Sequence, residues 1–277
     1  MPELPEVETV RQGLAQLVTG YRVKSAQDFH PRVLKRSSLA PLSVVAGARI
    51  TGVQRRGKFL WFTLNRAEAL VAHLGMSGQF LIGSSDRGTP KHVRASFSLQ
   101  RGLRKRELIF TDQRTFGWLS VEPMVAGVPL PAVHIARDPF DAAFDKPAVI
   151  AQMRSRKAGI KSVLLNQEIM SGVGNIYADE SLWRARIHPE SLACDLSVRQ
   201  VTALVDAAIA VMTEAIAVGG TSFDSLYINV NGESGFFAQS LAAYGQEHEP
   251  CPRCGRGIVR IKFGNRSSHF CARCQVK

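Results

Sequence analysis

The chain has 277 residues, of which 45% are hydrophobic, so it is long enough for two domains and too apolar for a disordered protein. Lysine and arginine number 35 against 23 aspartate and glutamate, which gives a formal net charge of +12. This charge favours a polyanion such as nucleic acid as the partner, although it could serve solubility alone. No secretory signal and no apolar run of about 18 residues is visible, so we expect a cytoplasmic protein with no membrane partner.

The first predicted element is a helix over residues 3–18. Pro5 suits a first helical turn, where a missing N–H is tolerated, and Gly20 follows the end of the run. Four apolar residues recur at helical spacing and predict one buried face: Val7, Val10, Leu14 and Leu17.

Residues 21–121 show the alternation and short apolar runs that are typical of strands. Strands are predicted at Ala48–Gln54 and Lys58–Leu64, on either side of a turn at Arg55–Gly57. Further alternation occurs at 93–99 and 108–110. Residues 1–121 are therefore predicted to form a β-sandwich domain with the N-terminal helix packed against it.

The second half of the chain is predicted to be helical. Residues 122–147 are rich in proline and lose periodicity, which is typical of an interdomain linker. Residues 148–246 contain predicted helices at 161–170, 176–186 and 197–218, followed by a loop from Thr221 to Gln246 without a period. With a cysteine module at 247–277, the fold class is predicted as α+β.

The cysteine module has the pattern of a zinc finger. Two C-x2-C pairs are separated by 16 residues, a spacing that brings four thiolates to one tetrahedral ion: Cys251, Cys254, Cys271 and Cys274. We expect one structural zinc ion. Two disulfides are the less favoured alternative in a reducing compartment. A basic hairpin at Arg260–His269 joins the pairs, and His269 is not expected to be a ligand because the four positions are already filled.

A glycine-containing turn, Ser171–Asn175, separates two of the predicted helices. Glycines at a helix start allow backbone N–H groups to approach an anion closely, and nearby Arg156 and Lys161 favour a phosphate site. An ordinary tight turn between packed helices is the alternative.

The N-terminus can act as a nucleophile. Removal of the initiator methionine exposes the secondary amine of Pro2, and an α-amino group with a pKa near 7.7–8.0 is partly neutral at neutral pH. Attack on a sugar C1′ forms a cationic iminium that promotes β-elimination of phosphate. Glu3 could transfer protons and Glu6 could be a second carboxylate, although acidic residues also favour the first turn of any helix.

Together these features resemble the formamidopyrimidine-DNA glycosylase family over essentially the whole chain. The resemblance rests on residues 1–10, 73–78 and 172–178 and on the four-cysteine module. It implies that Pro2 is the Schiff-base nucleophile and Glu3 the proton donor and shuttle. It also implies that Lys58 assists β-elimination and that Arg266 assists δ-elimination and grips phosphate.

The resemblance further implies a DNA-binding surface. Residues expected to contact the backbone near the lesion are His73, His92, Arg156, Lys161 and Asn175. Met76, Arg114 and Phe116 match residues that fill the gap left by an extruded base, the alternative for Met76 and Phe116 being core packing. Two features depart from the family pattern: Thr115 replaces a second arginine between Arg114 and Phe116, and the loop Thr221–Phe237 diverges most.

The expected function is that of a bifunctional glycosylase and AP lyase of base-excision repair that excises 8-oxoguanine and formamidopyrimidines by β,δ-elimination. Damaged double-stranded DNA is its expected partner and the bacterial cytoplasm, or the nucleoid within it, its location. We expect a monomer, since no coiled-coil pattern is present. The alternatives are an endonuclease VIII-type enzyme for oxidised pyrimidines, which Leu4 and the Met76, Arg114 and Phe116 set disfavour, and a non-catalytic DNA-binding protein.

Overall fold

The structure is a computed structural model that describes residues 2–34, 41–83, 91–221 and 237–277. The chain divides into two compact units, the first comprising residues 1–134 and 219–235 and the second residues 135–218 and 236–277. The division after His134 lies within the range 122–147 that the sequence predicts as a linker. The predicted loop lies largely outside the described residues, because 222–236 are not among them.

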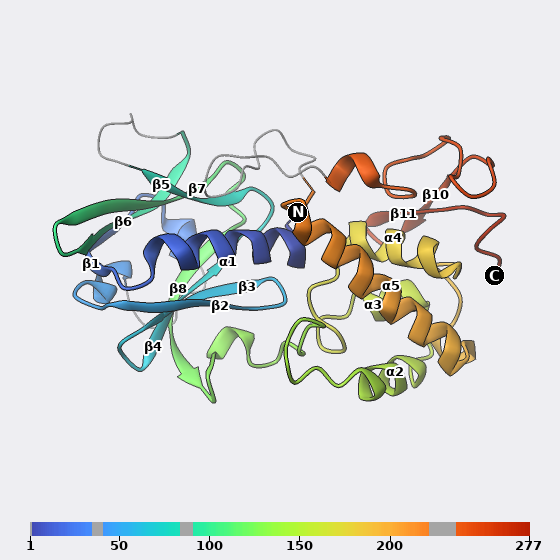
Figure 1. Cartoon of the computed structure of the whole chain (residues 1–277), viewed down its shortest axis with the longest axis horizontal. Coiled ribbons are helices and arrows are strands. Elements are labelled where there is room, and N and C mark those ends of the chain that lie inside the picture. Colours follow the sequence, from blue (N-terminus) through green and yellow to red (C-terminus); the bar gives the residue numbers. More distant parts are fainter. Residues whose placement is uncertain (1, 35–40, 84–90, 222–236) are drawn as a thin grey trace. The chain divides into compact units, whose positions relative to one another are not determined.

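Two antiparallel sheets form the first unit (Figure 1). The four-stranded sheet has the order β1 (Arg22–Asp28), β6 (Val93–Arg101), β7 (Arg104–Asp112), β5 (Gly78–Gly83). The five-stranded sheet has the order β2 (Ile50–Arg56), β3 (Phe59–Leu64), β4 (Glu68–His73), β8 (Trp118–Val125), β9 (Val128–Pro129). Phe62 of β3 and Phe80 of β5 meet edge to face with centroids 5.5 Å apart, so the two sheets share one core. The predicted β-sandwich is confirmed.

Helix α1 (Leu4–Val18) packs against β2 and β3 in the first unit. Its buried apolar face includes Val7, Val10 and Leu14, as their spacing predicts, whereas Leu17 is half-buried. Glu3 is the N-cap residue and Pro5 lies in the first turn. The residue that carries the amine, Pro2, therefore stands directly before the helix.

The turn between β2 and β3 begins two residues later than predicted and ends one residue later. Arg56 pairs with Phe59, so Gly57 and Lys58 form a two-residue hairpin loop, and Gly57 has φ 54°. Two-residue loops of this kind favour left-handed backbone, which glycine adopts without strain. The shift moves Lys58 from a strand to the tip of the hairpin. Strand β8 also continues to Val125, so the first residues of the predicted linker belong to a sheet.

The described residues of the second unit form four α-helices and the finger hairpin. The helices are α2 (Lys146–Arg154), α3 (Ile160–Leu164), α4 (Asn175–Ala185) and α5 (Val198–Ala217), and the hairpin strands are β10 (Val259–Phe263) and β11 (Arg266–Phe270). Short 3-10 helices occur at Pro31–Leu34, Leu42–Val45, Leu130–Ala132, Ala193–Asp195 and Phe237–Ser240 in the two units. α5 packs against α2 and α4 and begins at a capping box of Ser197 and Gln200.

α5 also passes a length and hydropathy test for a membrane span, and within the described residues it is the one helix that does so. However, 44% of its apolar window is buried inside the second unit, and the buried residues follow one face of the helix. Both observations are typical of a core helix in a globular domain.

One helix prediction was wrong in extent, and one helix was not predicted. The helix predicted at 161–170 ends at Leu164, because the side chain of Asn166 accepts a hydrogen bond from the N–H of Glu168 at 2.9 Å and turns the chain. Helix α2 was missed, although Asp145 caps it by accepting from the N–H of Ala148 at 3.0 Å. Pro147, which was assigned to the linker, lies in its first turn.

Candidate catalytic site and nucleic-acid interface

Two buried carboxylates follow Pro2 at the start of α1. Pro2 is buried, and Glu3 and Glu6 are each 2% exposed. The N–H of Glu3 donates to Oε2 of Glu6 at 2.8 Å, as part of a capping box. Both the catalytic interpretation of Glu3 and its simpler role as a helix cap are therefore compatible with its position.

Glu6 also holds the segment that follows α5. Its Oε1 accepts hydrogen bonds from the N–H of Thr221 at 2.8 Å and from the Thr221 hydroxyl at 2.9 Å. Gly220, with φ 85°, lies so close that a Cβ there would be 2.9 Å from Oε1. Because both carboxylate oxygens are engaged, Glu6 fixes the start of the loop next to Pro2 and Glu3.

Lys58, at the tip of the β2–β3 hairpin, is held indirectly by α1. Arg55 donates to Glu8 at 2.9 Å through Nε and to the carbonyl of Gly57 at 3.3 Å through Nη1. Burial raises the pKa of Glu8, but hydrogen bonds from Arg11 and Arg55 outweigh this and lower it. The hairpin that presents Lys58 is thus tied to the helix that presents Pro2, and sequence analysis did not detect this link.

The three proposed gap-filling residues lie on two adjacent loops of the first unit. Met76 is 39% exposed and Phe116 is 61% exposed, so the core-packing alternative is wrong for both. Arg114 is also exposed, and its Nη1 lies 3.9 Å from Sδ of Met76. Thr115, the departure from the family pattern, has φ 55°. Such a backbone is strained for a β-branched residue.

The two histidines differ in their surroundings. His73, at the end of β4, stacks on Trp118 with centroids 5.9 Å apart, and its Nδ1 accepts from the N–H of Gly75 at 3.1 Å. His92 is exposed and has φ 61°, and its carbonyl accepts from the N–H of Asp112 at 3.0 Å. His92 therefore faces solvent, whereas His73 is half-buried in an aromatic cluster.

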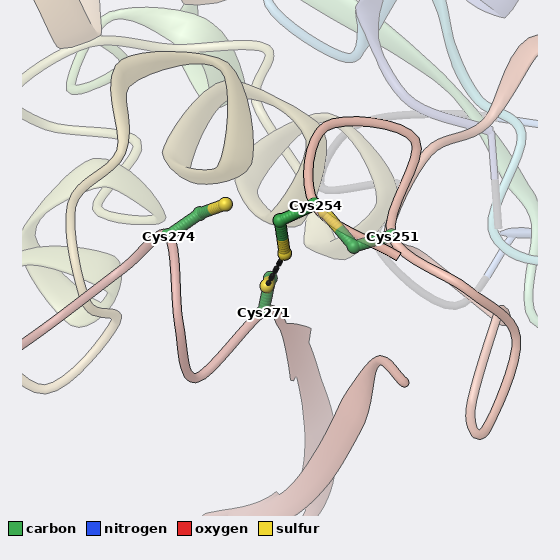
Figure 2. Close-up of side chains that lie close together, drawn as sticks. All are labelled: Cys251, Cys254, Cys271 and Cys274. Carbon is green, nitrogen blue, oxygen red and sulfur yellow. Dashed lines mark hydrogen bonds between the residues drawn. The ribbon is translucent and has the colours of Figure 1, made fainter. Parts of the chain in front are cut away.

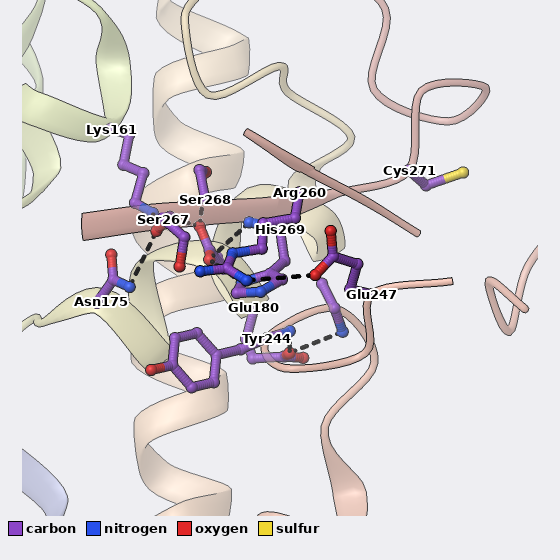
Figure 3. Close-up of polar contacts among 12 residues, drawn as sticks. Lys161, Asn175, Glu180, Tyr244, Glu247, Arg260, Ser267, Ser268, His269 and Cys271 are labelled. Atoms are coloured by element: carbon purple, nitrogen blue, oxygen red, sulfur yellow. Dashed lines mark hydrogen bonds and ion pairs between the residues drawn. The ribbon is translucent and has the colours of Figure 1, made fainter. Parts of the chain in front are cut away.

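In the second unit, Lys161 is part of a buried polar cluster (Figure 3). Its ammonium lies 2.7 Å from Oδ1 of Asp179, both side chains are 0% exposed, and it also donates to the carbonyl of Ser267 at 3.0 Å. Asp179 in addition accepts from Ser268 Oγ and from the N–H of His269, each at 2.9 Å. A fully buried ammonium cannot reach a phosphate in solvent, so the predicted direct DNA contact of Lys161 is wrong in this structure. The pair instead fastens β11 to α4.

Asn175 contacts the same cluster, and Arg266 precedes Ser267 of that cluster in the chain. Asn175 Nδ2 donates to the carbonyl of Ser267 at 3.0 Å, while its buried Oδ1 has no hydrogen-bond partner among the described residues. Arg266 is exposed at the start of β11, opposite Phe263. Arg156 is exposed in the segment before α3. In the second unit, Asn175 and Arg266 therefore both adjoin the segment Ser267–His269, which Asp179 binds. Sequence analysis did not identify Asp179.

Replacing Lys161 by methionine should lower the free energy of unfolding by about 3–5 kcal/mol, because the substitution leaves Asp179 as a buried charge without its cation. Urea unfolding followed by circular dichroism measures this. The exposed neighbour Lys157 gives the matched control, since Lys157→Met should change stability by less than about 0.5 kcal/mol. Equal stabilities of the two variants would contradict the structural role of the pair.

The four cysteines of the finger converge as predicted (Figure 2). Their Sγ atoms all lie within 4.8 Å of one another, and the Sγ atoms of Cys254 and Cys271 are 3.5 Å apart. Tetrahedral zinc with Zn–S bonds of about 2.3 Å separates its sulfurs by about 3.8 Å, whereas a disulfide needs about 2.05 Å. The cysteines are free thiols, so the geometry fits one zinc ion and excludes the disulfide alternative among the described residues.

A tryptophan on α4 supports the zinc site. Trp183 Nε1 lies 3.4 Å from Sγ of Cys251, and the guanidinium of Arg253 stacks over its ring at 3.8 Å. Burial raises the pKa of Cys251, but hydrogen bonds from Trp183 and the backbone N–H of Arg253 outweigh this and lower it to about 6. Donors aimed at a thiolate are what a zinc ligand requires.

Three family models match successive parts of the chain. The formamidopyrimidine-DNA glycosylase N-terminal domain matches residues 1–119, the formamidopyrimidine-DNA glycosylase H2TH domain matches 135–226, and the zinc finger found in FPG and IleRS matches 249–276. The order of the matches follows the order of the sandwich, the helices and the finger.

Curated relatives and solved structures agree with the family models. The formamidopyrimidine-DNA glycosylases of Acidothermus cellulolyticus and Mycolicibacterium smegmatis are each 51% identical, with 99% and 100% of this chain and 97% and 98% of those proteins covered. The crystal structure of MutM (Fpg) from Thermus thermophilus has a TM-score of 0.87 at 36% identity, covering 99% of this chain and 98% of that one. A Lactococcus lactis Fpg variant in complex with Fapy-dG containing DNA has a TM-score of 0.88 at 33% identity, covering all of both chains. The chain belongs to the formamidopyrimidine-DNA glycosylase family.

Proposed function

We propose that the imino nitrogen of Pro2, freed by removal of Met1, is the nucleophile of this enzyme, which is a DNA glycosylase and AP lyase of base-excision repair for oxidised purines. The observation that carries the proposal is the position of Pro2, directly before α1 and next to the buried carboxylates of Glu3 and Glu6. A buried site keeps water away from the nucleophile and strengthens the interactions of its carboxylates.

The reaction begins when the Pro2 nitrogen forms a bond to C1′ and the bond from C1′ to the damaged base breaks. Glu3 supplies a proton during base loss and opening of the sugar, and the nitrogen loses its own proton, which leaves a cationic iminium without an N–H. Loss of a proton from C2′ then expels the 3′ phosphate, and a second elimination expels the 5′ phosphate. These steps produce the nick on both sides of the sugar and release Pro2 after hydrolysis.

The remaining residues bind the DNA around the reacting sugar. Lys58 and Arg266 stabilise the phosphates that leave in the β and δ steps, and Asn175 binds a phosphate beside the lesion. His73, His92 and Arg156 add contacts to the backbone. Met76 and Phe116 fill the gap left by the extruded base, while Arg114 hydrogen-bonds to the base that remains.

The partner, cofactor, location and oligomeric state of the enzyme follow from the same assignment. Its partner is damaged double-stranded DNA, and its cofactor is one structural zinc ion held by the four finger cysteines. We place it in the bacterial cytoplasm, at the nucleoid, because its substrate is chromosomal DNA. It acts as a monomer, with one active site on one chain.

Trapping with borohydride on defined duplexes tests the proposal. We expect a covalent complex on duplexes that contain 8-oxoguanine or a formamidopyrimidine, and mass analysis should place the DNA on the N-terminal peptide that begins with Pro2. Faster trapping on an oxidised pyrimidine would instead indicate the endonuclease VIII type. Tight binding without any trap would indicate a non-catalytic protein.

A further inference from the structure

The loops that carry Met76, Arg114 and Phe116 are two crossings between the sheets of the first unit, and they run in opposite directions. Residues 74–77 lead from β4 in the five-stranded sheet to β5 in the four-stranded sheet, and residues 113–117 lead from β7 back to β8. Gly75, with φ 62°, lies so close to the second loop that a Cβ there would be 2.5 Å from the carbonyl carbon of Phe116. The crossings are therefore in direct contact.

One carboxylate joins the two crossings. Asp112, the last residue of β7, is 1% exposed. Its Oδ1 accepts from the hydroxyl of Ser77 at 2.5 Å and from the N–H of Arg114 at 3.1 Å, and its Oδ2 accepts from the N–H of Gly117 at 2.6 Å. Three donors from both loops thus compensate the burial of this charge, which would be unfavourable without them.

The same carboxylate binds both ends of a strained turn. Arg114 and Gly117 are the residues on either side of Thr115 and Phe116, and Thr115 has φ 55°. A β-branched residue keeps such a backbone only where the surroundings over-determine it. The hydrogen bonds from the N–H groups of Arg114 and Gly117 to Asp112 supply that restraint, and they fix the direction in which Phe116 leaves the backbone.

The backbone of Asp112 also binds the segment that carries His92, which is predicted to contact phosphate. Its N–H donates to the carbonyl of His92 at 3.0 Å, and its own carbonyl accepts from Nε of Arg94 at 2.9 Å. The side chain of Asp112 therefore holds the two loops, and its main chain holds the residue that precedes β6.

We propose that Asp112 is a positioning residue that sets Met76, Arg114 and Phe116 in the arrangement that fills the gap of an extruded base. This inference rests on the proposed function, because it assigns Asp112 to the loops that are proposed to enter the DNA double helix. Asp112 does not touch the reacting atoms, so its loss should impair extrusion and leave the chemistry of Pro2 unchanged.

Single-turnover excision from an 8-oxoguanine duplex tests the proposal with Asp112→Ala. The variant should be slower by about 10- to 100-fold, the effect expected for losing hydrogen bonds to a charged group. The exposed Asp28 gives the matched control, and Asp28→Asn should keep the wild-type rate. Borohydride trapping on a single-stranded abasic oligonucleotide, which needs no extrusion, should stay within about threefold of wild type for both variants.

A double-mutant cycle separates positioning from a general structural effect. In a Phe116→Ala background, Asp112→Ala should slow excision by fewer fold than it does in the wild-type background, because part of its effect is exerted through Phe116. Additive losses, an unchanged excision rate, or an equal loss on the single-stranded substrate would overturn the proposal. Should Asp112→Ala fail to fold, Ser77→Ala removes the hydrogen bond from Ser77 Oγ to Asp112 and the one that Oγ accepts from the N–H of Arg114. It leaves the bonds from Arg114 and Gly117 to Asp112 in place, so it should show a smaller loss of about threefold in excision, with trapping again unchanged. Wild-type protein that forms no trap on either substrate would instead refute the proposed function.

Discussion

Replacing Pro2 by glycine should reduce strand nicking and borohydride trapping by on the order of 10³-fold or more, as expected for loss of a covalent nucleophile. A proline nitrogen forms an iminium that has no N–H proton to lose, so its positive charge persists while C2′ is deprotonated. A glycine nitrogen forms an imine that can become neutral and lose this advantage. Single-turnover nicking of an 8-oxoguanine duplex measures the effect, with binding measured separately.

Binding of the lesion duplex should change by less than about threefold in the same variant, because the cations that we propose contact phosphate are retained. Pro147 offers a control, since it is a proline at the start of a helix in the second unit, whereas Pro2 stands directly before α1 in the first. Pro147→Gly should therefore keep the wild-type nicking rate. Nicking by Pro2→Gly at the wild-type rate, or by protein that retains Met1, would show that another group attacks the sugar.

The features predicted well from the sequence are local ones. Pro5 and the spacing of the apolar residues define α1 within a single stretch of chain. The cysteine pairs define the finger in the same way, because each C-x2-C pair presents two ligands without help from the rest of the fold. Such local patterns can be recognised in the sequence without knowing which residues pack against them.

The features that were missed depend on contacts between distant residues. Lys161 resembles an exposed cation in the sequence, and only the packing of α4 and β11 shows that it is paired with Asp179 and buried. Asp112 and Glu8 likewise carry no motif of their own, because their partners are backbone groups and side chains up to 47 residues away. Helix α2 is different, since its Asp145 cap and Pro147 were visible as a helix start and were assigned to a linker.

The departure at Thr115 acquires a physical meaning only in the structure. A left-handed backbone at a β-branched residue is unfavourable by roughly 1–2 kcal/mol, so this position stores strain beside Phe116. An exchange of arginine for threonine removes one cation from the loop without relaxing that backbone. The departure therefore concerns the charge of this loop, which we propose contacts DNA, while its shape is restrained by Asp112 and the adjoining glycines.

Replacing Cys271 by serine should abolish zinc binding and unfold the finger, because structural zinc contributes about 10–16 kcal/mol that is available only to the folded finger. Zinc content measured on purified protein should fall to background. Trp183 fluorescence should change, since its indole donates to the neighbouring ligand Cys251. Cys194 is the matched control: it lies outside the zinc cluster, and Cys194→Ser should retain one zinc ion per chain.

Loss of the finger should impair DNA binding and δ-elimination while the chemistry of Pro2 is retained. Arg266 lies on β11 between the zinc ligands, so Cys271→Ser should weaken binding to a lesion duplex and remove the δ-elimination product. Pro2 belongs to the other unit, whose core contains no finger residue, so trapping on a single-stranded abasic oligonucleotide should persist and yield the β product. A variant that lacks zinc but nicks the lesion duplex like wild type would show that neither the metal nor Arg266 is needed for the reaction.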